Sequence, residues 1–375
     1  MTPRRLAAFA AKRLLAPFLL VAAASGRVPR LVRAGAAASL VGLWSAVLVR
    51  YRRWGKAQTA DELERLRSAN WEAFTRHYNE QVPTIEEEFA LWGEFHQHRH
   101  EMRYDLVAAA VRQHLPIGGT VLDVGCGSGL VADRLDDVDA TYLGLDFPAH
   151  HIGYVKKRFA DMPTALRTCF VRGDGEKLPF ADASVDVVVF SEVIEHLLQP
   201  ENATWEIARV LRPGGVLVMT TNNASEVPLH SPLTHLFPWL EKAIGFRHAG
   251  LISLRPWVWP QPVDRALLPP GSGDVFLPHT HHIAAQTEAM FGAAGLRTLR
   301  RSSFEFPPPQ ARTTAWLEAK GDRGRRVVDT IEAVATRIPL VNRLGCHLML
   351  VVRKDGPPVA ATPPPGIWPG PFSER

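Results

Sequence analysis

The segment that most constrains the fold is the run TVLDVGCGSGLVADRL at residues 120–135. An apolar stretch is followed by alternating glycines and then by a helical pattern. This order predicts a buried strand, a tight turn and a helix that opens near Ser128. Gly125, Gly127 and Gly129 have no Cβ, so the backbone can turn sharply there and a ligand can approach it closely. The helix N-terminus adds further N–H donors, and the run therefore predicts a ligand-binding unit.

The segments that follow supply acids at the ends of further strands. Residues 141–145 predict a second strand that ends at Asp146, 23 residues beyond Asp123. An acid at this place suits the hydroxyl groups of a ribose. Residues 171–197 predict a strand end with Asp174, a polar loop and a strand at 185–190. Residues 206–223 predict a helix, a Pro-Gly-Gly turn and a fifth strand.

The glycine spacing also bears on which nucleotide binds. A dinucleotide fingerprint needs its third glycine at position 130, where Leu130 stands. A pyrophosphate site, and with it a nicotinamide dehydrogenase, is therefore disfavoured. Measuring whether NADH binds tests the dehydrogenase alternative.

Taken together, these motifs resemble a class I S-adenosylmethionine-dependent methyltransferase of the broad group that includes the ubiquinone- and menaquinone-biosynthesis methyltransferases. The resemblance covers residues 100–223 and resumes at 279–299 and 346–354. It implies an α/β fold, a seven-stranded, mostly parallel Rossmann-like sheet with helices on both faces. It also implies that S-adenosylmethionine binds at the carboxyl ends of the strands.

The resemblance further implies a cofactor role for individual residues. Asp123 would position the glycine loop and the cofactor amine, Asp146 would hold both ribose hydroxyls, and Asp174 would accept the adenine amino group. Phe147 would lie on the adenine, and Arg103 would reach the methionine carboxylate. The full implied set is Arg103, Asp123, Gly125, Gly127, Gly129, Asp146, Phe147, Asp174, Gly175 and Ser191.

Methyl transfer needs little catalytic apparatus, because the sulfonium already activates the methyl group and positioning of the acceptor supplies most of the acceleration. His196 is the candidate base for an acceptor that keeps its proton. On a helical turn, Glu192, Glu195 and His196 would share one face, which raises a metal-dependent alternative. Small-RNA 2′-O-methyltransferases and some quinone O-methyltransferases have a similar ExxEH. Under this alternative, which includes methylation of an RNA 3′ end, a downstream histidine (His279, His281 or His282) would complete the divalent metal site.

The charge of the chain is concentrated in a leader. The first 60 residues hold eleven Lys and Arg and no acid, whereas the remainder holds 32 basic and 38 acidic residues. A mildly acidic body disfavours a nucleic acid partner. Two short apolar runs, at 14–24 and 34–49, lie within the basic leader. We expect residues 1–56 to form a helical hairpin at an anionic membrane surface, with a processed targeting segment or a disordered extension as alternatives.

The rest of the chain divides into segments that differ in sequence pattern. Residues 57–118 predict a helical cap and 119–354 the methyltransferase domain, with an extra helical element at 307–340 and a Pro-rich disordered tail at 355–375. An insert at 224–278 contains nine prolines together with Trp239, Trp257 and Trp259. A long aromatic insert that leaves strand five predicts a lid over the acceptor pocket, which favours a small, lipophilic or aromatic acceptor methylated on oxygen or carbon.

Three cysteines without paired spacing indicate a reducing compartment. The prediction is thus a cytoplasmic enzyme that is peripheral to or anchored at a membrane. A catalytically silent, membrane-bound cofactor-binding scaffold is the non-enzymatic alternative, because an intact glycine loop is equally compatible with it.

Overall fold

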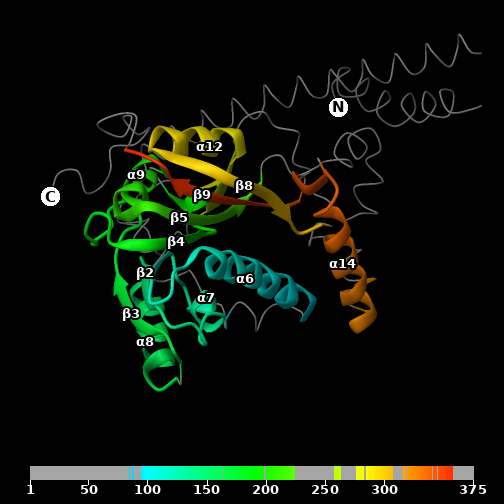
Figure 1. Ribbon diagram of the computed structural model, residues 1–375. Coiled ribbons are helices and arrows are strands. Elements are labelled where there is room, and N and C mark those ends of the chain that lie inside the picture. The colour runs from blue at the N-terminus through cyan, green and yellow to red at the C-terminus, as the bar shows by residue number, and fades with distance from the viewer. Residues whose placement is uncertain are drawn as a thin grey trace, which may run out of the picture.

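The computed structural model describes residues 84, 87, 94–162, 164–197, 200–223, 257–262, 276–282, 284–306, 316–317, 319–339, 341–343 and 345–357. Within these residues a seven-stranded sheet carries helices on both faces (Figure 1). The predicted leader at 1–56, most of the predicted insert at 224–278 and the tail from 358 onwards lie outside the described residues.

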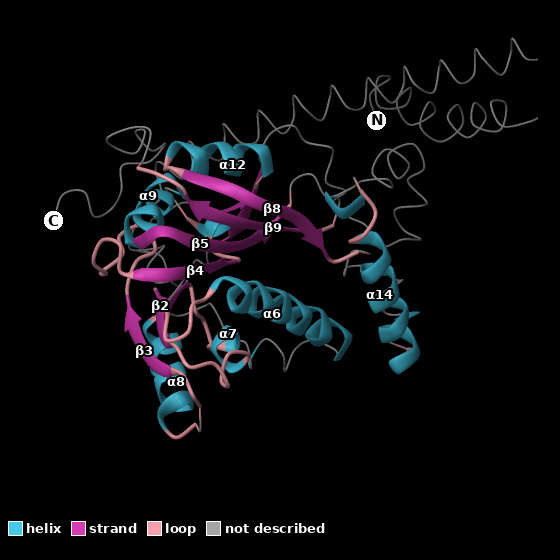
Figure 2. Cartoon of the chain, viewed as in Figure 1, coloured by secondary structure: helices cyan, strands magenta, loops and turns pink. Residues whose placement is uncertain are grey.

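The sheet confirms the predicted seven-stranded, mostly parallel arrangement (Figure 2). In space its strands follow the order β3-β2-β1-β4-β5-β9-β8. The first five are parallel, and β9 runs antiparallel to both of its neighbours. In chain order the strands are β1 (Thr120–Val124), β2 (Thr141–Asp146), β3 (Arg167–Arg172), β4 (Val185–Ser191), β5 (Leu211–Asn222), β8 (Leu296–Phe304) and β9 (His347–Lys354).

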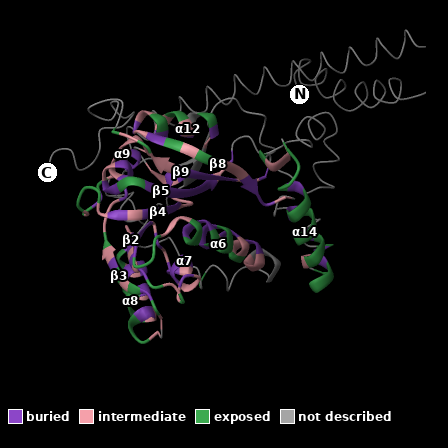
Figure 3. Cartoon of the chain, in the orientation of Figure 1, coloured by how far each residue is buried: buried purple, intermediate pink, exposed green. Residues whose placement is uncertain are grey.

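The helices pack on the sheet as two layers with separate apolar cores. Alternate strand residues point to opposite faces, so Val187 belongs to one core and Val188 to the other. One face is covered by α6 (Glu94–His114), α7 (Leu130–Asp133) and α8 (Ala149–Ala160). The other is covered by α9 (Pro200–Val210) and α12 (Ala284–Ala293). Figure 3 shows the buried strands between these layers.

Two details of the predicted elements differ from the structure. The first helix opens at Leu130 rather than near Ser128, because Gly129 has a φ of 79° and a left-handed residue cannot belong to a right-handed helix. The Pro-Gly-Gly segment falls within the bounds of β5, but it leaves the ladder. Leu211 pairs with Val185 and the next pair is Val216 with Val187, so four residues of β5 pass unpaired.

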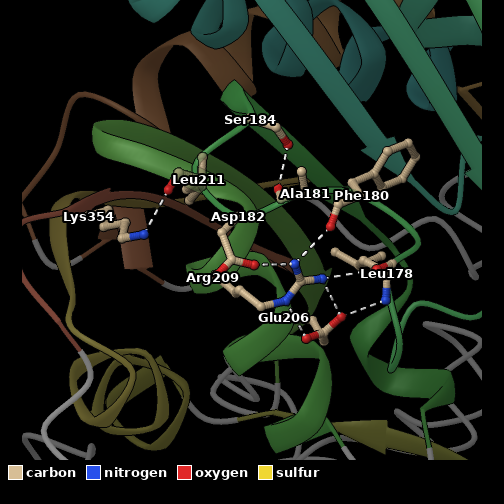
Figure 4. Close-up of polar contacts among 9 residues, drawn as sticks. All are labelled: Leu178, Phe180, Ala181, Asp182, Ser184, Glu206, Arg209, Leu211 and Lys354. Carbon is tan, nitrogen blue, oxygen red and sulfur yellow. Dashed lines mark hydrogen bonds and ion pairs between the residues drawn. The ribbon is translucent and has the colours of Figure 1, made fainter.

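Arg209 of α9 fixes the segment that leads into β4 (Figure 4). Its guanidinium donates to Asp182 Oδ1 at 2.7 Å and to the carbonyl oxygens of Phe180 and Leu178 at 2.7 and 2.9 Å. It also forms a bidentate ion pair with Glu206, and the Glu206 carboxylate in turn accepts the Leu178 N–H at 2.7 Å. The planar Arg209 guanidinium thus provides hydrogen-bond donors for two carbonyl groups of a loop that lies outside the helices and strands.

Residues from the predicted insert and its C-terminal continuation form a two-stranded antiparallel ribbon. It consists of β6 (Trp257–Pro262) and β7 (Phe276–His281), with Trp259 paired to His279. β7 lies against η2 (Ile194–His196), the short 3₁₀ turn that follows β4. Part of the predicted insert thus lies next to the carboxyl end of β4.

The extra helical element predicted at 307–340 contains α14 (Asp322–Ala335), followed by the 3₁₀ turn η4 (Val341–Arg343). In the part of the chain that is described, no helix combines the length and the apolar character needed to cross a bilayer.

Candidate functional site

The glycine loop after β1 opens the candidate site at the carboxyl edge of the sheet. Gly125, Gly127 and Gly129 all have positive φ, at 80°, 49° and 79°. A Cβ at Gly125 would meet Val193 at 2.2 Å, and one at Gly129 would meet Val155 and Phe159 at 2.8 Å. At Gly127 a Cβ would meet nothing within 4 Å. The outer two glycines therefore allow close packing within the protein, and the middle one borders open space that a ligand can use.

Asp146, the last residue of β2, ties this loop to the next one. Its carboxylate accepts the Gly127 N–H at 2.6 Å and the Phe147 N–H at 2.7 Å. A ring nitrogen of His151 on α8 lies 3.5 Å from Oδ2. Each carboxylate oxygen has further acceptor capacity, so these contacts leave room for ribose hydroxyls. The sequence identified Asp146 but not His151, whose only signal was its place on the helix after Asp146.

The loop after β3 lies beside Asp146, because β2 and β3 are parallel and Asp146 pairs with Arg172. Asp174 Oδ1 accepts the Glu176 N–H at 2.8 Å, and burial raises the pKa of its carboxyl. Gly175 is buried, and a Cβ there would lie 3.1 Å from Val124. The Arg172 guanidinium lies 5.9 Å from the centre of the Phe147 ring. The residues implied for the adenine end thus come from adjacent strand ends.

Asp123, unlike the residues of the loops after β2 and β3, lies in the interior of the sheet. It is 2% exposed, and its Oδ2 accepts a hydrogen bond from the Tyr142 hydroxyl of β2. Burial raises the pKa of this carboxyl to about 7, although the Tyr142 hydroxyl acts against the shift. The structure thus places Asp123 beneath the loop, bonded within the sheet, and its contact with a cofactor amine stays a prediction.

A buried ionic network borders the site where β4 and β8 end and β9 begins. His347 Nδ1 lies 3.0 Å from Glu192 Oε2, and His347 Nε2 lies 3.6 Å from Glu305 Oε2. Arg99 of α6 lies 3.4 Å from the same Glu305 oxygen. Burial acts to lower the pKa of His347, but the two carboxylates outweigh it and raise that pKa to about 9. The imidazole is therefore held as a cation.

Both acids of this network have an unusual backbone conformation. Glu192 has a φ of 57° and Glu305 a φ of 65°, in the left-handed region that side chains other than glycine rarely adopt. Burial acts to raise the pKa of Glu192, but His347 outweighs it and lowers that pKa. Backbone strain of this kind persists where the surroundings hold it in place, and here both strained residues face one imidazolium. No sequence motif had indicated the roles of His347, Glu305 and Arg99.

Arg103 and Ser191, both predicted to bind cofactor, lie near this network. Arg103 is 6% exposed and donates to the Tyr104 hydroxyl at 3.0 Å. Burial acts to lower its pKa, but Tyr104, Glu192 and Glu305 together raise it. Ser191 Oγ lies 2.8 Å from Thr220 Oγ1 of β5. Direct contact of either side chain with a cofactor stays a prediction.

The expectation that Glu192, Glu195 and His196 share one helical face is wrong. The turn η2 begins only at Ile194, and the positive φ of Glu192 takes that residue out of helical register. Glu192 faces His347, whereas Glu195 is 1% exposed and accepts the Thr221 hydroxyl at 2.9 Å. Burial raises the pKa of Glu195, and Glu192 adds to the rise.

This donor set does not fit a metal ion. Across the described ranges, which include Glu192, Glu195, His196 and His282, no three His, Cys, Asp or Glu side chains are grouped so as to hold one. A carboxyl whose pKa is raised also favours its protonated form, which is a poor metal ligand.

The fold and the edge define a class of protein: a doubly wound sheet whose glycine loop, ribose-type acid and adenine-side loop converge at the carboxyl ends of adjacent strands. Comparison with known proteins agrees with this class. Residues 122–219 match the sequence model of a family described as "Methyltransferase domain". This segment is thus similar in sequence to a methyltransferase domain, and it lies within a Rossmann-like sheet.

Among curated proteins, a probable S-adenosylmethionine-dependent methyltransferase of Mycolicibacterium smegmatis is 40% identical over 125 residues, which are 33% of this chain and 44% of that protein. An uncharacterized methyltransferase of Mycobacterium tuberculosis is 36% identical over 111 residues, 30% of this chain and 42% of that protein. The chain therefore spans less than half the length of these relatives.

Two solved structures are also similar to this chain. A putative sarcosine dimethylglycine methyltransferase from Galdieria sulphuraria is 16% identical, with a TM-score of 0.43 over 68% of this chain and 86% of that one. The CcbJ methyltransferase from Streptomyces caelestis is 17% identical, with a TM-score of 0.41 over 68% of this chain and 90% of that one.

Proposed function

We propose that this protein transfers the methyl group of S-adenosylmethionine to a small lipophilic or aromatic acceptor, on oxygen or carbon. The observation that carries the cofactor assignment is the open space above Gly127 beside the Asp146 carboxylate. A methionine portion fits over a backbone that has no side chain, and a ribose fits against a carboxylate with acceptor capacity left.

The residues that would hold the cofactor are those that the structure gathers at the carboxyl edge. Gly127 would lie beneath the methionine portion, Asp146 would accept from the ribose, and Asp174 with Gly175 would border the adenine. When bound, S-adenosylmethionine supplies a methyl group activated by its sulfonium, so the chain needs chiefly to orient the acceptor and exclude water.

His196 remains the candidate to accept a proton from the acceptor. It ends η2 directly after β4, and β7 lies against this turn. A base at this edge would serve an acceptor hydroxyl or an acidic carbon, and an acceptor already deprotonated would not need it. A metal-assisted route, including methylation of an RNA 3′ end, is not proposed, because Glu192 lies outside the turn that holds Glu195 and His196, and no three described acids, histidines or cysteines are grouped as a metal site.

The nature of the acceptor rests on the ribbon β6–β7. Its sequence, Trp-Val-Trp-Pro-Gln-Pro paired with Phe-Leu-Pro-His-Thr-His, is rich in aromatic and proline residues, and its second strand lies against η2. Sites for flat or lipophilic ligands are commonly lined by aromatic side chains. We therefore place the acceptor under this ribbon, and we propose that the basic leader holds the protein at the cytoplasmic surface of an anionic membrane.

The test is methyl transfer from S-adenosylmethionine carrying a trideuterated methyl group. The full-length protein is incubated with organic and with aqueous extracts of its host, and products that gain the labelled methyl group are sought by mass spectrometry. Label in the organic fraction that is lost in the Asp146→Asn variant supports the proposal. Label confined to water-soluble products would overturn the lipophilic acceptor. Cofactor binding without transfer to any extract would favour a non-enzymatic scaffold.

A further inference from the structure

Helix α14 carries a second apolar face that the rest of the described protein leaves exposed. Its inner face is buried: Gly324, Val328, Glu332 and Ala335 point to the body of the protein. A Cβ at Gly324 would lie 2.1 Å from the Leu317 carbonyl oxygen, so the helix packs closely there. Figure 1 shows α14 beyond the ends of β8 and β9, and Figure 3 shows most of its length exposed.

The exposed stripe consists of four aliphatic side chains at helical spacing. Val327, Ile331, Val334 and Ile338 are 46%, 39%, 51% and 44% exposed. Their separations of four, three and four residues place them on one side of the helix. Hydrogen bonds from Arg337 N to the Val334 carbonyl and from Ile338 N to the Ala335 carbonyl continue the helical turn to the end of the stripe.

The acidic side chains of α14 all have partners within the protein. All three of its acids are engaged: Asp322 pairs with Arg325 at 2.5 Å, Asp329 pairs with His98 at 2.9 Å, and Glu332 accepts the N–H groups of Glu305 and Phe306.

The cations beside the stripe are not engaged in this way. Arg323 precedes Val327 by one helical turn, and Arg337 follows Val334 by three residues. Within the described part of the chain, neither of these two arginines forms an ion pair. Exposed Trp316 and Lys320, 5.5 Å apart, add an aromatic ring and a cation just before the helix.

An apolar stripe with a cationic border is the pattern of a helix that lies in the plane of an anionic bilayer. Its 14 residues span about 21 Å at 1.5 Å per residue, so the helix can lie flat along the interface. A second copy of the chain fits less well, because it would oppose the same arginines. Four half-covered side chains also fall far short of the roughly 800 Å² per partner that a stable interface buries.

We propose that α14 docks in the headgroup region of an anionic phospholipid bilayer, with Val327, Ile331, Val334 and Ile338 inserted between the lipids and Arg323 and Arg337 on their phosphates. This proposal uses only described residues and does not depend on the leader or on the acceptor proposed above. It has a consequence for the site, because Glu332 of α14 holds the backbone of Glu305, which faces His347. The docked helix would thus stand beside the methyl-transfer edge.

The first test reports on the helix itself, so that binding through the leader cannot imitate the result. Full-length protein receives an environment-sensitive fluorophore at Val334→Cys or, as the matched control, at Ala333→Cys, the next residue, which is exposed and lies outside the stripe. Both are made with Cys169→Ser and Cys346→Ser, and Cys126 stays because it is buried. We expect vesicles containing phosphatidylglycerol to raise emission at 334 by about twofold or more, and to leave 333 unchanged.

Lipids that carry a quencher on the acyl chain should then quench position 334 and spare 333. Vesicles of phosphatidylcholine alone should give little change at either position, because the arginines then lack anionic partners. Equal responses at 333 and 334, or none at 334 while the protein sediments with the vesicles, would overturn the proposal.

The second test uses charge. Arg323→Glu together with Arg337→Glu should weaken binding to anionic vesicles about tenfold or more, and Thr336→Glu, on the other side of the helix from Val334, should not change it. All three positions are exposed, so the folded state should survive each change. If Val334→Asp instead converts a dimer in solution into a monomer without changing vesicle binding, the stripe is an interface between copies and the proposal fails.

Discussion

The hydrogen bonds of Asp146 give a prediction whose magnitude follows from the structure. Asp146→Asn keeps the shape of the side chain but replaces one oxygen by an NH₂ group. The carboxylate accepts two N–H groups, from Gly127 and Phe147, so the amide must present its own donor to one of them. Losing one charge-assisted hydrogen bond costs about 1.5 to 3 kcal/mol.

The lost hydrogen bond would weaken the hold on the loop that is proposed to bind the cofactor. The substitution would also weaken the contact with the ribose. We expect the affinity for S-adenosylhomocysteine, measured by calorimetry, to fall about 10- to 150-fold. Asp139→Asn is the matched control, since this exposed acid only pairs with Arg167 at 2.8 Å on the surface and should leave affinity unchanged. A folded Asp146→Asn protein with wild-type affinity would refute the cofactor site.

Four further outcomes are expected. Because the pKa of His347 is raised from 6.5 to about 9, the stability that its imidazolium contributes is fully present below pH 6.5 and is lost as the pH rises through 9. Urea titrations of His347→Gln between pH 7 and 10 should therefore lack the alkaline decline of the wild type. Asp123 has its pKa raised from 3.8 to about 7, so the stability of its protonated form is lost as the pH rises through 7. Asp123→Asn should gain stability relative to the wild type between pH 5 and 8, by a few kcal/mol at most; an unchanged difference would contradict the buried carboxyl. Arg209→Lys should lower the free energy of unfolding by about 1 to 3 kcal/mol, because a lysine cannot serve two carbonyls and two acids at once; EDTA should leave turnover of the wild type unchanged, and loss of activity restored by magnesium would revive the metal alternative.

The sequence was informative where one residue type alone meets a backbone requirement. Gly125 and Gly129 have to be glycine because any Cβ would enter Val193 or Phe159, and such positions can be recognised in the printed sequence. Near-continuous apolar runs such as Val185–Ser191 likewise predicted strands buried on both faces.

The sequence was silent where function depends on distant segments meeting. His347 and Glu305 stand more than a hundred residues from Glu192, and only the insertion of β9 between β5 and β8 brings them together. The positive φ of Glu192 also has no local signal, because no glycine or turn residue marks it. The expectation that Glu192, Glu195 and His196 share one helical face was wrong for this reason, since helical spacing presupposes a helix that Glu192 does not join.

The position of β9 has a consequence for how the domain is made. β8 touches the sheet only through β9, and β9 is the last of its strands in the chain. During synthesis β8 therefore has no partner, and the edge of β5 stays open, until residues 347–354 have been added. A ribosome that stalls before His347 would release a chain whose glycine loop can form but whose sheet exposes an unpaired edge. Quality control of this protein should thus recognise C-terminal truncation far more readily than loss of the residues before α6.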